Sequence, residues 1–265
     1  MPSPAILVAI GCTTGFLAGL LGAGGGFATV VLLLAAGAGA HEAVGTSLIF
    51  TVVVGAWGTA VHLRRGTASP WLAVALGLPS AATALVGAQA AEALSDRALV
   101  LWFAALTLIV AVAFLARPTQ DPESAVVDAV ADPRPGSLRL EMRPTTRLVV
   151  GAMGGGAVIG LLKGLFGVGG GFLLVPFMVL VLAVPEHLAV GSSLFAILIG
   201  SIAGGIRHAS YGNVDWEMLW PLLPGGVAGS WIGAVMVRRV SAQTIRRAFV
   251  ALMLASAAFL IAKGL

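Results

Sequence analysis

Charged residues and cysteine are scarce in this sequence. Only 10% of its 265 residues are charged and 58% are hydrophobic, whereas a soluble domain carries about 25% charged residues. The first 40 residues contain no charged side chain, which argues against a cleavable signal peptide, because such a peptide begins with positive charge. The composition excludes an ordinary soluble domain and predicts a polytopic membrane protein.

Other absences narrow the function. The single cysteine, Cys12, excludes an intramolecular disulfide and a cysteine metal cluster. No aspartate or glutamate lies in the middle of an apolar run, and no HExxH, GxSxG or paired acidic motif is present, so an intramembrane enzyme is disfavoured. The net charge of +4 comes from arginines in loops. We therefore expect no enzyme activity, no metal, no cofactor and no nucleic acid partner.

One stretch of the sequence occurs twice. Residues 15–27 read GFLAGLLGAGGGF and residues 160–172 read GLLKGLFGVGGGF, with nine of 13 positions identical. Downstream, HEAVGTSL at 41–48 matches HLAVGSSL at 187–194. Glycines and histidines stay in step through both halves, which indicates an internal repeat. We predict repeats at 1–116 and 148–265, separated by a polar, proline-containing linker at 117–147.

Ten apolar runs follow from this division. They cover residues 4–22, 27–40, 43–63, 70–92 and 98–116, then 148–167, 171–185, 188–206, 217–237 and 246–263. The third, fourth and fifth runs of each half reach the ~20 residues of a full span. The runs after the glycine triplets are shorter, and we expect half-length or re-entrant helices there. The predicted fold is all-α, with two inverted repeats of about five apolar helical segments each and breaks at the Gly-Gly-Gly loops.

The arginines indicate the topology. If each half crosses the membrane an odd number of times, the halves are inverted, and 11 arginines face one side against two on the other. An even number of crossings gives eight against five. Because positive residues gather in the cytoplasm, the first arrangement is favoured. It places the N-terminus outside and the linker in the cytoplasm.

The glycine triplets are candidate substrate-binding loops. Three glycines are unfavourable within a helix, and lipid tolerates a broken backbone only where protein or water satisfies its polar groups. Each triplet frees backbone N–H groups at the start of a helix, which is a typical anion site. The alternative is that glycine only allows close helix packing. The candidate residues are Gly24, Gly25, Gly26, Gly169, Gly170 and Gly171.

Hydroxyl side chains near the start of the third runs are further candidates. They could donate to a bound anion, or could equally cap a helix or bond to a carbonyl one turn back. The matched pairs are Thr46 with Ser192 and Ser47 with Ser193.

Lys163 is the only basic residue deep in an apolar run, and its counterpart in the first half is Ala18. An ionisable residue within the membrane indicates function, although a lysine can also extend its amino group to the membrane surface. The matched His62 and His208 lie near run ends, where we expect solvated side chains.

The motif GxxxGxxGxGGGF, found twice, with Pro176 in the second copy and G(T/S)SL following, resembles the TauE/SafE sulfite exporter (TSUP) family. The resemblance covers both halves and omits only the linker. It implies a permease for sulfite, sulfonates or related sulfur-containing anions, usually in a bacterial inner membrane.

These observations together suggest a mechanism of alternating access. Two helix N-termini would hold an oxyanion between the halves, which rock around it. The alternative is a passive anion channel, which the sequence does not separate from a transporter. The expected partners are a small anion and membrane lipid. The sequence does not decide whether the protein forms a homo-oligomer.

Overall fold

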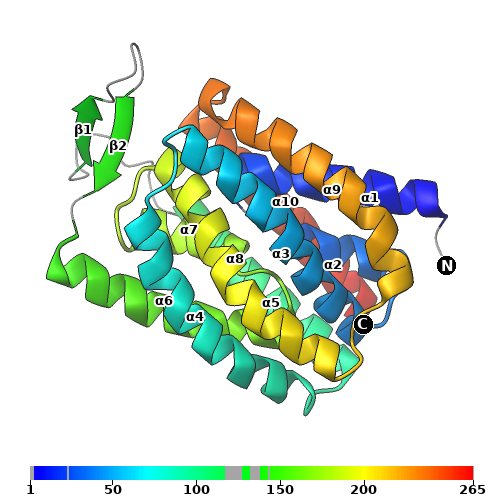
Figure 1. The fold of residues 1–265 in the computed structure, drawn as a ribbon. Coiled ribbons are helices and arrows are strands. Elements are labelled where there is room, and N and C mark those ends of the chain that lie inside the picture. Colours follow the sequence, from blue (N-terminus) through cyan, green and yellow to red (C-terminus); the bar gives the residue numbers. More distant parts are fainter. Residues whose placement is uncertain (1–2, 23, 117–126, 132–137, 143, 265) are drawn as a thin grey trace.

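The computed structural model describes residues 3–22, 24–116, 127–131, 138–142 and 144–264. Within these residues the first half contains α1 (Pro4–Leu21), α2 (Gly26–Ala35), α3 (Ala40–Arg64), α4 (Pro70–Ala91) and α5 (Asp96–Ala116). The second half contains α6 (Thr146–Phe166), α7 (Gly171–Leu180), α8 (Glu186–Ser210), α9 (Trp216–Met236), the 3-10 turn η2 (Val237–Arg239) and α10 (Ala242–Gly264). Each predicted apolar run is a helix, so the all-α fold class is confirmed (Figure 1).

Helix length divides the described helices into two groups. Eight are long and apolar enough to cross a membrane, and α2 and α7 have only 10 residues each. The short helices follow the glycine triplets, as predicted. The sequence assigned a full span only to the third, fourth and fifth runs of each half, but α1 and α6 also reach membrane-spanning length.

Glycines on α1 let it pack directly on the backbone of α9. A Cβ on Gly11 would overlap the carbonyl oxygen of Leu222, and one on Gly19 would overlap that of Ser230. The residue numbers rise together along this contact, so α1 and α9 run in the same direction. Close approach through small residues is typical of membrane helices. The second half repeats the arrangement, because α6 packs on α4 through the matched glycines Gly156, Gly160 and Gly164.

The central helices α3 and α8 cross in opposite directions. Gly58 of α3 lies beside Leu194 near the start of α8, and Gly204 near the end of α8 lies beside Leu48. Helices α3 and α8, which are equivalent in the two halves, are therefore antiparallel.

Contacts with α9 fix the direction of α3 relative to α1. Gly45 lies beside Asn213, just before α9, and Gly58 lies beside Ser230 within it. Helix α3 is therefore parallel to α9, and so to α1. Because α1 and α3 point the same way, the short α2 between them must bring the chain back. Helices α1 and α2 thus form a helical hairpin, and α6 and α7 are the matching helices of the second half.

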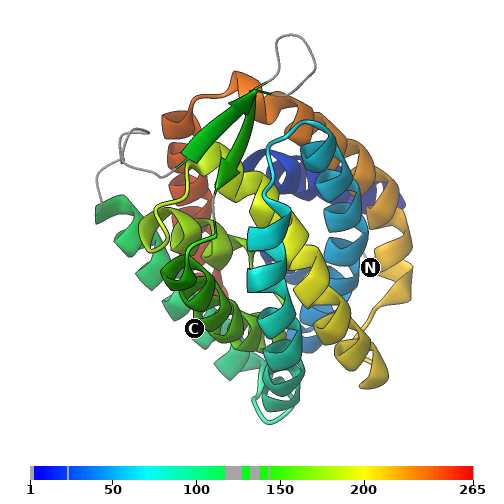
Figure 2. The ribbon, with the colours of Figure 1, turned by 60° about the vertical axis from the view of Figure 1, so that its left-hand side comes forward.

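The linker contributes two strands, β1 (Val127–Ala131) and β2 (Leu138–Met142), which pair antiparallel. We expected a polar linker with no domain here; residues 117–126, 132–137 and 143 lie outside the described residues, and α6 begins at Thr146, within the predicted linker. Figures 1 and 2 place the strands at the same end of the helical bundle as the α3–α4 and α9–α10 connections. A hydrogen bond from Arg65 Nη1, just after α3, to the carbonyl of Val235 in the last turn of α9, 3.4 Å long, joins the ends of these two helices. Three arginine-rich segments thus share one end.

Candidate functional site

The two glycine breaks have a backbone conformation that only glycine adopts readily. Helix α1 ends at Gly22 with φ of 68°, and α6 ends at Gly167 with φ of 67°. The first two glycines of each triplet also have positive φ, between 62° and 82°. Other residues pay roughly 1–2 kcal/mol in this region. The third glycine of each triplet is the first residue of a new helix, α2 or α7.

The breaks meet at the middle of the bundle. A Cβ on Gly26 would lie 2.9 Å from the backbone nitrogen of Gly169 and 2.6 Å from Thr51 Oγ1, and Thr51 is near the midpoint of the 25-residue α3. Phe27 and Phe172, which follow the triplets, stack with ring centroids 5.0 Å apart. The N-termini of α2 and α7 are thus neighbours.

This meeting point has the properties of an anion site. The first N–H groups of a helix have no partner along the helix, and they form its positive end. Two such ends therefore lie side by side, within a helical bundle that crosses a membrane. All six triplet glycines are buried, so the site is closed in this structure. An anion held there would have to exchange its water for these N–H groups.

Two of the predicted hydroxyls hold the breaks in place. Ser47 Oγ donates to the carbonyl of Gly167 over 2.6 Å, and Ser193 Oγ donates to that of Gly22 over 2.8 Å. Each serine belongs to one half and binds the break of the other half. These matched bonds fasten the two halves together at the site.

The other two predicted hydroxyls accept from the backbone at the starts of neighbouring helices. Thr46 Oγ1 accepts from the N–H of Asp215, and Ser192 Oγ accepts from that of Ser69, both over 2.8 Å. Asp215 and Ser69 precede α9 and α4 respectively. A direct role of these four hydroxyls in binding substrate stays a prediction.

The sequence prediction missed Thr51. Its hydroxyl is buried against Gly26 and Gly169 and has no hydrogen-bond partner among the described residues. A buried hydroxyl without a partner is unfavourable, so Thr51 is a candidate contact for a bound substrate. Thr51 follows Ser47 by one helical turn on the same face of α3, and this spacing was the available signal.

Lys163 lies beside the second break and does not reach the surface. Its side chain is fully buried, and its Nζ donates to the carbonyl of Ile197 over 3.3 Å. Its Cε would lie 2.8 Å from a Cβ placed on Gly170. Within the described part of the chain, no aspartate or glutamate forms an ion pair with it. The amino group therefore lies in the protein interior, beside the second glycine break.

The expectation of solvated histidines was wrong. His62 and His208 are both fully buried. His62 Nε2 bonds to the carbonyl of Gly19 over 3.1 Å, and His208 Nε2 bonds to that of Gly164 over 2.9 Å. Both bonds lie in the last turns of α1 and α6, where carbonyls lack helical partners. The two histidines thus support the ends of the helices that lead into the breaks.

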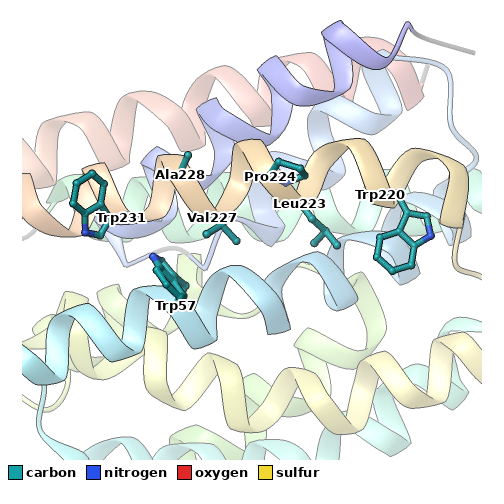
Figure 3. Close-up of a pocket in the computed structure, with 7 residues that line it drawn as sticks. All are labelled: Trp57, Trp220, Leu223, Pro224, Val227, Ala228 and Trp231. Atoms are coloured by element: carbon teal, nitrogen blue, oxygen red, sulfur yellow. The ribbon is translucent and has the colours of Figure 1, made fainter.

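An apolar groove lies away from this site, on the outer surface between α3 and α9. It has a volume of about 580 Å³ and is lined by Trp57, Trp220, Leu223, Pro224, Val227, Ala228 and Trp231 (Figure 3). The lining carries no charged side chain, so it does not suit an anion. No group of three histidine, cysteine, aspartate or glutamate residues within the described ranges could hold a metal ion.

Comparison with known proteins identifies relatives over nearly the whole chain. A family model described as sulfite exporter TauE/SafE matches residues 7–260. The probable membrane transporter protein YunE of Bacillus subtilis is 26% identical over 252 residues, covering 91% of this chain and 90% of its own. A probable membrane transporter protein of Xylella fastidiosa (strain Temecula1) is 28% identical over 261 residues, covering 97% and 94%. No solved structure gives a significant match.

Proposed function

The chain belongs to the sulfite exporter TauE/SafE family of membrane transporters, and from that premise we propose that it carries sulfite, an organosulfonate or a related small sulfur-containing anion across a bacterial inner membrane. The observation that carries this proposal is the contact between the N-termini of α2 and α7 in the middle of the bundle. In transporters, broken helices that point their positive ends at the membrane midplane bind anionic groups.

In this proposal the substrate exchanges its water for protein donors. The N–H groups of both glycine breaks supply most of them, and Lys163 supplies positive charge. Such replacement is needed because an anion without partners in an apolar interior is very costly. The proposed binding residues are Gly24, Gly25, Gly26, Thr46, Ser47, Lys163, Gly169, Gly170, Gly171, Ser192 and Ser193, to which Thr51 is added.

Transport by alternating access requires the closed site to open to each side in turn. We propose that the two halves are inverted repeats that rock around the breaks. The antiparallel crossing of α3 and α8 supports this inversion. The re-entrant pairs α1–α2 and α6–α7 would then approach the site from opposite sides of the membrane. A passive anion channel with the same site is the alternative.

The function is tested with purified protein in liposomes. We expect uptake of labelled sulfite that saturates with concentration, and accumulation above the external level when an ion gradient is imposed. Liposomes without protein give the background. Saturable accumulation supports a transporter, whereas flux that only follows the gradient of sulfite supports the channel. Absence of flux for sulfite and for simple sulfonates would refute the proposed substrate class.

The proposed topology places the linker in the cytoplasm and the N-terminus outside. The three arginine-rich segments at one end of the bundle support it, because positive loops stay in the cytoplasm. A protease applied to inside-out vesicles should cut within residues 117–147, and the same protease applied to spheroplasts should leave the chain intact. Cleavage in spheroplasts alone would reverse the orientation.

A further inference from the structure

The two halves of the site differ at one pair of equivalent spaces. In the first half, the ring of Phe50 lies over Gly25 and against Gly226. In the second half, the side chain of Lys163 lies over Gly170, the counterpart of Gly25. Both side chains are fully buried. Lysine and phenylalanine thus fill matching positions on opposite sides of the central contact.

Both residues have small counterparts in the other half, so each half has one large and one small side chain at these two positions. Ala18 corresponds to Lys163, and Ala196 corresponds to Phe50. If both large side chains were present in the same half, they would compete for one space. Of the two large side chains, the first half therefore carries only Phe50 and the second half only Lys163.

The surroundings of Lys163 are polar as well. A Cβ on Gly200 would overlap Lys163 Nζ and lie 2.6 Å from Ser80 Oγ, so these two polar atoms are neighbours. Ser80 Oγ is buried and has no hydrogen-bond partner among the described residues. The counterpart of Ser80 is Gly226, which the ring of Phe50 covers. The side of the site around Gly170 thus offers the amino group of Lys163 and the hydroxyl of Ser80, and the side around Gly25 offers the aromatic face of Phe50.

Resting on the proposed function, we propose that Lys163 and Phe50 make the site directional, so that it selects an anion with one charged end and one apolar end. The oxyanion group faces Lys163 and Ser80. The organic group R of a sulfonate R–SO₃⁻ faces Phe50, across the helix N-termini. Phe50 and Lys163 are then specificity-determining residues with separate tasks, one for each end of the substrate.

The test uses the full-length protein in liposomes and measures inhibition of labelled sulfite uptake by methane-, ethane- and propanesulfonate. Burial of R against Phe50 should lower the inhibition constant about threefold to fourfold for each added methylene group. Sulfate, which has no apolar end, is the control anion and should inhibit less than propanesulfonate.

Two variants separate the two ends. Phe50→Ala should flatten the dependence of the inhibition constant on the chain length of the sulfonate. Lys163→Met should weaken inhibition by all three sulfonates by the same factor. Phe195→Ala on α8 removes a partly buried ring outside the site and should leave the chain-length dependence unchanged. Phe50→Leu keeps most of the apolar volume, so it should fold and keep a dependence on chain length that is shallower than that of the unmodified protein; an unchanged or absent dependence in this variant would count against the role of Phe50.

The outcomes distinguish this inference from the proposed function. If the unmodified protein takes up sulfite but the three sulfonates inhibit equally whatever their chain length, the directional site is overturned and the transporter proposal still stands. A Phe50→Ala variant that weakens all sulfonates equally would assign Phe50 to packing alone and would also overturn it. Absence of any sulfite or sulfonate flux would instead refute the transporter proposal.

Discussion

Replacing Gly170 or Gly25 by valine is expected to abolish transport while the protein still inserts and folds. Both glycines have positive φ, 82° and 72°. A valine at Gly170 would also push into Lys163 Cε, 2.8 Å from its Cβ. The branched side chain would therefore move the N-terminus of α7 or α2 and cover the N–H groups that are proposed to bind the anion. Sulfite flux in liposomes and elution of the variant as a single species in size-exclusion chromatography are the measurements.

The chain offers matched controls for the backbone cost of this change. Gly212 and Gly37 also have positive φ, 78° and 96°, and a Cβ on either would meet nothing within 4 Å. Gly212→Val and Gly37→Val should carry a similar conformational cost of roughly 1–2 kcal/mol and retain transport. If Gly170→Val transports normally, the glycine triplet serves only to turn the chain, and the proposed binding site is in the wrong place. If the control variants lose transport as well, backbone strain explains the effect.

Loss of the charge at Lys163 should weaken anion binding by about 10- to 100-fold, the equivalent of ~1.5–3 kcal/mol for a hydrogen bond to a charged group. Lys163→Met keeps the length of the side chain, and Lys163→Arg keeps the charge. We expect the methionine variant to lose most affinity for sulfite and the arginine variant to retain part of it. The inhibition constant of unlabelled sulfite in the flux assay measures both.

Thermal stability provides an independent readout for Lys163. The side chain is fully buried with one hydrogen bond to Ile197 and no carboxylate partner among the described residues. An unpaired charge in the membrane interior is costly, so Lys163→Met should unfold at a higher temperature than the unmodified protein in detergent. Lower affinity together with higher stability is typical of a binding residue. Normal affinity with lower stability would assign Lys163 to packing.

The positions of the helices could be predicted from the sequence alone. Apolar runs long enough to cross a membrane must form helices there, because lipid offers no partner for backbone polar groups. The glycine triplets predicted the two breaks, and their repetition predicted matched halves. The full length of α1 and α6 was missed.

The sequence by itself therefore determined the class of protein, its repeat and the place of its breaks, since these depend on local hydrophobicity and on the conformational freedom of glycine. Only the tertiary structure decided which groups meet. It brought Thr51 and both breaks together, gave Ser47 and Ser193 partners in opposite halves, and buried His62 and His208. The two serine contacts join residues more than 100 positions apart, and helix periodicity carries no information about any of these tertiary contacts. The physical reason is that α1 packs on α9 and α6 on α4 through glycine surfaces, whose pairing depends on shape across the whole bundle.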